Sequence, residues 1–342
     1  MVCLALGATA CTPTDNPAPE TSQSVAASAT PSSAPSKANE EPDEVSKPEA
    51  RRLHANELGR VPVLMYHRIL RHPESEYDRT PRAFRQELRR LYREGYRPIR
   101  AIDLVRGDIV VPPGKSPVVL TFDDASREQF AYRGNGSVDP HTALGILLDF
   151  GRSHPSFHPV ATLYVNRSPF GTSKGPSMLR DLYRRGFELG NHTASHADLA
   201  TLSKEGVRKE LAQGEKVITS AVPAAKVQTL ALPLGIWPRR HRWAIAGSWR
   251  GLRYRHLGVF LVGAEPAASP FSRAFDPFAI PRVRTSPQKG KTPNYGSTFW
   301  LDYLRKHPEE RFISDGDPAT VSFPRSERAE LLKRYREAAN PY

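Results

Sequence analysis

Two short segments of the chain carry side chains that together could bind a metal ion and activate water. Asp123 and Asp124 follow an apolar run at residues 118–122, and His192 and His196 follow a second strand-like run. A catalytic zinc site uses three protein ligands and keeps a fourth position open for water. The histidines and one aspartate would form such a set, which leaves the other aspartate to act as a general base. The residues therefore predict a metal-dependent hydrolase.

Each half of this pattern also has a less specific explanation. An isolated Asp-Asp pair is usually a solvated turn or the start of a helix. Two histidines at i and i+4 lie on the same side of a helical turn, as a shared metal requires, but such a pair is more often a surface feature. Here a strand leads into His192 and a helix-like run follows His196, so we favour a metal site.

The same residues resemble a known family. Thr-Phe-Asp-Asp at 121–124 and His-Thr-Ala-Ser-His at 192–196 resemble the first two motifs of the polysaccharide deacetylases, the NodB-homology carbohydrate esterases. Residues 61–67 and 278–282 resemble an opening strand and a late segment of the branch that acts on poly-N-acetylglucosamine. The resemblance covers residues 60–285, and the order of the motifs makes it specific.

The resemblance implies a role for each matching position. Asp124, His192 and His196 would hold one divalent ion, Zn²⁺ or alternatively Co²⁺ or Ni²⁺, and Asp123 would be the base. A third family motif matches Ala-Leu-Pro-Leu-Gly at 231–235, so that the backbone N–H of Leu234 would stabilise the oxyanion. Three further residues are candidates for contact with the substrate: His67, Pro233 and Trp237. From their positions alone, His67 could instead cap its strand, and Trp237 could instead be a buried core residue.

The chain also departs from the family pattern. Ala231 replaces an arginine that often orients the catalytic aspartate, and Leu234 replaces an aromatic residue. We find no late Leu-x-His motif to supply a general acid. His256 and His307 follow the other motifs, and we expect both to be solvated surface residues. The group that protonates the leaving amine is therefore not assigned by the sequence.

The expected function is metal-dependent hydrolysis of N-acetyl groups on an envelope or extracellular polysaccharide built from N-acetylglucosamine. The enzyme would be a hydrolase of carbon–nitrogen amide bonds, its partner an N-acetylated glycan, and its oligomeric state a monomer. Two alternatives stay open: a catalytically weak glycan-binding surface lipoprotein, and a related metal amidohydrolase acting on a small non-sugar amide.

Apolar runs alternate with helical patterns after residue 55. Strands are predicted at residues 61–66, 118–122, 161–165, 187–189, 227–231 and 259–262. Repeated β-then-α units predict a parallel α/β fold, and the resemblance selects a distorted (β/α) barrel of the NodB-homology type. Residues 125–159 are long for one such step and predict a loop near the site before a helix begins near Asp139. Residues 325–342 are expected to form a basic amphipathic helix.

Composition divides the 342-residue chain into three parts. Residues 1–11 resemble a truncated lipoprotein signal with Cys11 as the lipidated residue, residues 12–55 a disordered Pro/Ala/Ser/Glu-rich linker, and residues 56–342 a catalytic domain with a C-terminal extension. We therefore expect export to the cell envelope or beyond, with a lipid anchor on the outer face of the membrane. The net charge of +13 favours an anionic partner, but no nucleic-acid motif is present, so we expect no nucleic acid.

Overall fold

The computed structural model describes residues 45–285 and 295–342. The predicted signal segment, Cys11 and residues 12–44 of the predicted linker lie outside this range. Within it, none of the helices combines the length and the apolar character needed to cross a membrane.

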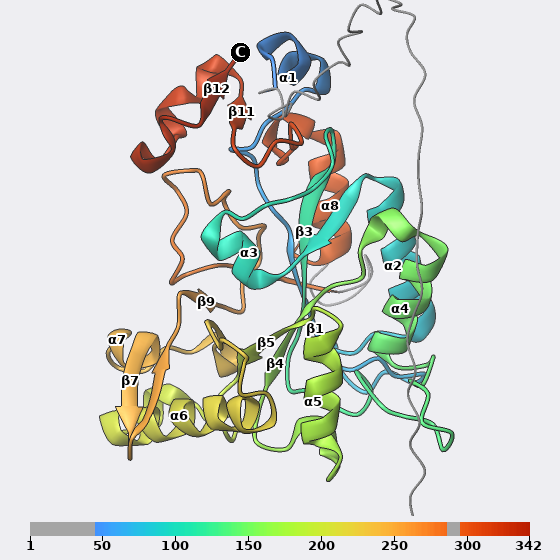
Figure 1. The fold of residues 1–342 in the computed structure, drawn as a ribbon, viewed down its shortest axis with the longest axis vertical. Coiled ribbons are helices and arrows are strands. Elements are labelled where there is room, and N and C mark those ends of the chain that lie inside the picture. Colours follow the sequence, from blue (N-terminus) through green and yellow to red (C-terminus); the bar gives the residue numbers. More distant parts are fainter. Residues whose placement is uncertain (1–44, 286–294) are drawn as a thin grey trace, which may run out of the picture. The chain divides into compact units, whose positions relative to one another are not determined.

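The core of the fold is a sheet in which every pair of neighbouring strands is parallel (Figure 1). Its strands are buried along almost their whole length, because parallel sheets are covered on both faces and so need continuous apolar runs. The strands follow the order β10-β1-β3-β4-β5-β6-β9, with β2 beside the first half of β3. Their bounds are β1 (Val63–Tyr66), β2 (Tyr96–Ile99), β3 (Ser116–Phe122), β4 (Thr162–Val165), β5 (Glu188–Asn191), β6 (Thr229–Ala231), β9 (Gly258–Phe260) and β10 (Val283–Arg284).

The two ends of the strand order approach each other. Isolated parallel bridges join Phe260 to Ile280 and Gly263 to Val283, so the chain beyond β9 runs beside the segment that enters β10. This curled parallel sheet with outer helices is the predicted distorted (β/α) barrel, and the predicted fold class is confirmed. The closure also places β10 within reach of residues at the end of β3.

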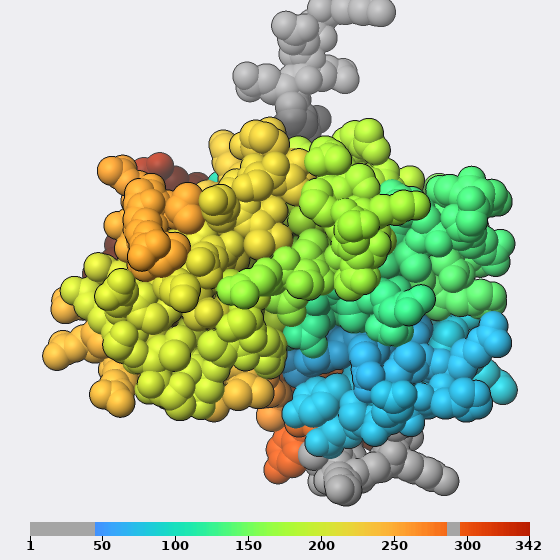
Figure 2. All heavy atoms as spheres, turned by 90° about the horizontal axis from the view of Figure 1, so that it is seen from below, coloured from blue at the N-terminus to red at the C-terminus, as the bar shows by residue number. Residues whose placement is uncertain are grey.

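Four of the helices form where the sequence shows helical spacing, at residues 81–93, 143–153, 175–184 and 204–221. In the second helix, Thr80 caps the N-terminus through its side-chain oxygen, Pro81 occupies the first position, and Phe84, Leu88 and Leu91 are buried at helical spacing. The helices are α1 (Lys47–Leu53), α2 (Pro81–Arg93), α3 (Ala101–Arg106), α4 (Ala143–Ser153), α5 (Gly175–Arg184), α6 (Lys204–Ala221), α7 (Arg242–Ile245) and α8 (Ser297–Lys306). Figure 2 shows that segments far apart in sequence, coloured blue, green and yellow, meet on one face of the molecule.

Three expectations about where helices and the linker lie are wrong. The linker predicted to reach residue 55 is too long, because α1 begins at Lys47 and buries Ala50. The helix predicted at 325–342 is absent: β11 (Val321–Phe323) pairs with β12 (Ala339–Pro341), and short 3₁₀ turns lie between them. The helix predicted near Asp139 begins at Ala143. Strand β2 and the hairpin of β7 (Ala246–Trp249) and β8 (Leu252–Arg255) were not predicted from the sequence.

Candidate active site

Asp123 lies directly after β3 and is bound on both oxygens by one arginine. Nη1 of Arg282 donates to Oδ1 at 2.6 Å, and Nη2 donates to Oδ2 at 2.8 Å. Both side chains are almost fully buried, and Arg282 is held in turn by donating its Nε–H to the carbonyl of Leu261 at 2.9 Å. Burial alone would raise the pKa of Asp123, but the Arg282 charge, with His192, holds that pKa well below its usual value. Asp123 is therefore an ionised, fixed carboxylate.

Asp124, His192 and His196 come together from two strand ends. Oδ1 of Asp124 lies 3.5 Å from Nε2 of His192 and 3.7 Å from Nε2 of His196. One ligand atom from each residue lies within 4.8 Å of the other two. Two imidazoles and a carboxylate are a ligand set that suits zinc and leaves a coordination position for water.

The hydrogen bonding of His192 fits a metal ligand. Its Nδ1–H donates to the carbonyl of Ala231 at 2.8 Å, which leaves a lone pair on Nε2. That Nε2 is buried and has no hydrogen-bond partner among the described residues. A buried nitrogen without a partner is costly, and a metal ion facing Asp124 and His196 would satisfy it.

The histidine segment is a loop with strained residues, so the expected helical turn is wrong. Thr193 and His196 have φ values of 61° and 57°, and Asp124 has φ 76°. Left-handed backbone at such residues costs free energy and is found mostly at functional sites. The rings of the two histidines nevertheless lie 4.9 Å apart. The curvature of the loop brings them together.

A buried polar network fixes the start of this loop. Asn191 accepts a hydrogen bond from the Thr193 N–H at 2.9 Å through its side-chain oxygen. Its side-chain nitrogen donates to the Leu211 carbonyl at 2.9 Å and to Nε2 of His256 at 3.3 Å. His256 is only 1% exposed, so the expectation of a solvated surface histidine is wrong. Its other nitrogen donates to the Ala244 carbonyl at 2.7 Å.

His67 faces Asp123 from the end of β1. Its Nε2 lies 3.9 Å from Oδ2 of Asp123, and its ring lies 5.0 Å from the ring of Tyr77. Burial lowers the pKa of His67 despite the neighbouring carboxylates. His67 is therefore the one histidine near Asp123, among the described residues, that does not belong to the candidate metal set.

The site opens into a cavity of about 360 Å³. Leu232, Leu234 and Val262 provide an apolar side, and the lining also includes these residues: His67, Arg68, Ser75, Tyr77, Asp78, Asp123, Asp124, His192 and His196. Leu234 has φ 60° and is 58% exposed at the cavity. Pro233 is buried, and Trp237 stacks on His241 at 4.1 Å; neither lines the cavity in the described structure.

Comparison with known proteins shows the family to which these motifs belong. Residues 111–248 match the family model of the polysaccharide deacetylases. A chitooligosaccharide deacetylase of Sinorhizobium fredii is 32% identical over 124 residues, which make up 36% of this chain and 49% of that protein. The chain contains a polysaccharide deacetylase domain. The family predicted from the motifs is confirmed, and the chain spans about half the length of the curated relatives it matches.

Solved structures of deacetylases share the fold of this deacetylase domain. The deacetylase PplD of Streptococcus pyogenes, in complex with acetate, has a TM-score of 0.52 at 19% identity, covering 71% of this chain and 97% of that one. BC0361, a polysaccharide deacetylase from Bacillus cereus, also has a TM-score of 0.52 at 19% identity, covering 72% of this chain and 68% of that one.

One residue of the candidate site was missed by sequence reasoning. Position 231 carries no arginine, and the guanidinium that binds Asp123 belongs to Arg282, on the segment just before β10. The signal was the late segment at 278–282, which the sequence analysis noted without assigning a role to its arginine. Its function depends on barrel closure, which no local pattern reveals.

Proposed function

We propose that the domain removes N-acetyl groups from an N-acetylglucosamine polysaccharide. Asp124, His192 and His196 would hold the divalent ion that the reaction uses, with Zn²⁺ preferred over Co²⁺ or Ni²⁺. The observation that carries this proposal is the buried, unpartnered Nε2 of His192 beside Asp124, with an ionised Asp123 next to it. When bound, the ion would polarise the acetamide carbonyl and acidify the attacking water.

Asp123 is the base in this proposal. Its carboxylate is held on both oxygens by Arg282, so it cannot rotate away from the water whose proton it accepts. The arginine also keeps the carboxylate ionised across the physiological pH range. The backbone N–H of Leu234 would donate to the oxyanion, because Leu234 lines the same cavity as Asp124.

His67 is the proton donor that the sequence did not assign. Its Nε2 is on the cavity side, close to Asp123, and would donate a proton to the amine as the C–N bond breaks. Asp123 supports this role, because its negative charge favours the protonated imidazole against the effect of burial. The cavity of about 360 Å³ has exposed residues, Tyr77 and Leu234, in its lining, which suits one sugar of a longer strand.

The test is acetate release from N-acetylglucosamine oligomers by the purified chain loaded with zinc. Asp123→Asn should retain about one zinc per chain and lose turnover by roughly 10³-fold or more, because the base is removed and the ligands remain. Absence of acetate release with zinc, cobalt and nickel would refute the proposal. Loss of zinc in Asp123→Asn would reverse the roles of the two aspartates.

Export and lipid anchoring at Cys11 stay predictions, tested by locating the full chain in fractionated cells.

A further inference from the structure

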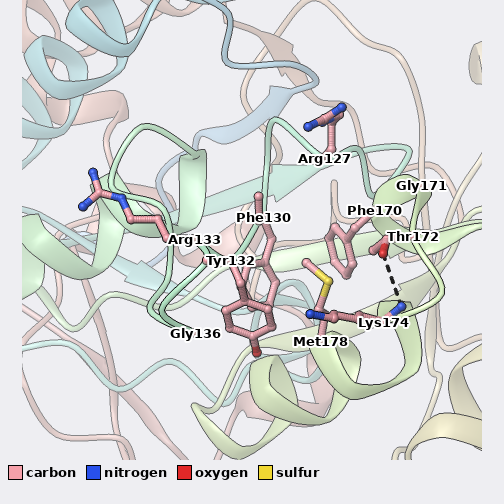
Figure 3. A pocket seen from close by; sticks show the side chains of 12 residues that line it. Arg127, Phe130, Tyr132, Arg133, Gly136, Phe170, Gly171, Thr172, Lys174 and Met178 are labelled. Atoms are coloured by element: carbon pink, nitrogen blue, oxygen red, sulfur yellow. Dashed lines mark hydrogen bonds between the residues drawn. The ribbon is translucent and has the colours of Figure 1, made fainter.

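A second cavity, of about 670 Å³, lies between the segment that follows the catalytic aspartates and the start of α5 (Figure 3). Arg127, Arg133 and Lys174 surround it, and none of its described lining residues is acidic. None of these three cations forms an ion pair within residues 45–285 and 295–342. All three are exposed, whereas half-buried arginines such as Arg68 and Arg90 are paired with carboxylates. The cavity therefore concentrates uncompensated positive charge.

The floor of this cavity is apolar. Phe130, Phe170 and Met178 are buried there, and the ring of Phe130 lies 4.9 Å from that of Tyr132 and 5.3 Å from that of Phe170. Figure 3 shows these rings at the centre of the cavity, with Lys174 reaching toward Tyr132 and the guanidinium groups of Arg127 and Arg133 at the outer edges. Tyr132 is half-buried and keeps part of its ring accessible. An apolar floor with a cationic rim suits a ring-shaped ligand that carries negative charge.

The wall that carries Arg133 is held in place by local hydrogen bonds. Tyr132 and Val138 form an antiparallel bridge, and the Arg133 N–H donates to the Ser137 carbonyl at 2.8 Å. Gly136, at φ 79°, closes the turn. The hydroxyl of Tyr132 donates to Oδ2 of Asp181 at 3.1 Å, which joins this turn to α5. Part of the binding surface is thus formed before any ligand arrives.

The cavity is also fixed relative to the catalytic centre. Ala125 follows Asp124 directly, and its carbonyl accepts a hydrogen bond from the Phe170 N–H at 2.5 Å. The side-chain amide of Gln129 donates to the carbonyl of His67 at 2.9 Å and to that of Asp123. One short segment therefore contributes both to the catalytic cavity and to the cationic one.

We propose that this second cavity binds an anionic sugar of the same glycan strand whose N-acetyl group is hydrolysed at Asp123. The negative group would be a carboxylate or a phosphate on a sugar, held by Arg127, Arg133 and Lys174, while the sugar ring lies against Tyr132. The inference rests on the proposed function. Nucleic acid fits less well, because Phe130 and Phe170 are buried and leave no run of exposed rings on which successive bases could stack.

The experiment compares three oligomers of equal length with the zinc-loaded full chain: neutral N-acetylglucosamine, N-acetylglucosamine alternating with glucuronic acid, and N-acetylglucosamine joined through phosphodiesters. At low salt, KM for one anionic oligomer should be about 10-fold below that for the neutral one, since each exposed pair contributes modestly. The cavity variant R127Q/R133Q/K174Q should remove this difference and leave kcat and the neutral KM unchanged.

The matched control is R253Q/R255Q/K306Q, which removes the same charge from exposed residues of β8 and α8 that do not line the cavity. It should keep the preference for the anionic oligomer. Whichever anionic oligomer has the lower KM shows whether the cavity prefers a carboxylate or a phosphate. Equal KM values for all three oligomers in the wild-type chain would overturn the inference while leaving the proposed deacetylase intact. An equal loss of the preference for the anionic oligomer in both triple variants would also overturn it.

Binding measurements separate this inference from the proposed function. If no oligomer is deacetylated, calorimetry with the same oligomers still tests the cavity. Tighter binding of an anionic oligomer that disappears only in R127Q/R133Q/K174Q would support the site without the reaction. Tighter cavity-dependent binding of single-stranded DNA than of either anionic glycan would overturn the proposal.

Discussion

Asp123 and Arg282 stand 159 residues apart in the chain and form a buried pair with two hydrogen bonds, at 2.6 and 2.8 Å. The pair fixes the orientation of the proposed base and its charge at once. Arg282 is fixed in turn because its Nε–H donates a hydrogen bond to the Leu261 carbonyl. Leu261 lies just after β9, on the segment that runs beside the residues leading into β10. The barrel closure thus directly orients the carboxylate that we propose as the base.

We expect Arg282→Gln to lower kcat by roughly 10²-fold or more, because Asp123 loses its fixed orientation. The free energy of unfolding should fall by about 3–5 kcal/mol, since a buried carboxylate is left without its charge partner. Steady-state kinetics and urea unfolding measure the two effects. Arg152→Gln, which removes an exposed cation paired with the exposed Asp149, serves as the control and should change both quantities little. Unchanged kcat in Arg282→Gln would contradict the positioning role.

His67→Gln tests the proton donor through the choice of leaving group. An amine leaves only after protonation, whereas the phenolate of an aryl acetate leaves without it. We expect the variant to lose roughly 10²-fold or more in amide hydrolysis and far less in hydrolysis of an aryl acetate, with zinc content unchanged. Equal losses on both substrates would show that His67 does not protonate the leaving group.

His256 should make stability depend on pH. Burial lowers the pKa of His256 to about 4 in the folded chain, whereas an unfolded histidine titrates near 6.5. Between these values the unfolded chain binds a proton that the folded chain does not, so stability falls as pH falls from about 6.5 to 4. The slope from this group is about 1.4 kcal/mol per pH unit. Urea unfolding of the metal-free chain at pH 7, 6 and 5 measures the free energy of unfolding. This free energy should decrease less with falling pH in His256→Gln than in the wild type. Equal decreases in the two proteins would contradict the assignment.

Gly214→Ala should disturb the metal site without touching a ligand. A Cβ at this position of α6 would lie 2.4 Å from Oδ1 of Asn191 and 3.0 Å from the Thr193 carbonyl carbon. The added methyl would push the start of the His192–His196 loop and cost about 1–3 kcal/mol. We expect weaker zinc binding by titration calorimetry. Gly206→Ala, on the same helix but next to Leu202 and Ser203, should bind zinc as the wild type does.

The residues of the candidate metal set could be identified from sequence because each lies in a short motif after an apolar run. Local order and spacing were enough to identify Asp124, His192 and His196. The parallel fold follows from the alternation of strands and helices along the chain. The helical geometry expected between the histidines was wrong, since spacing alone cannot tell a helical turn from a loop with left-handed residues at Thr193 and His196.

Tertiary structure alone decided the rest. Whether Arg282 or His256 lies in solvent or in the core depends on which strands pair and how the barrel closes, and those contacts join residues far apart in the chain. The sequence by itself determined which groups could bind a metal and act as a base. Only the closed barrel determined which arginine holds Asp123, which histidine faces it, and that a cationic cavity lies beside them, because a buried charge is oriented by partners that long-range packing supplies.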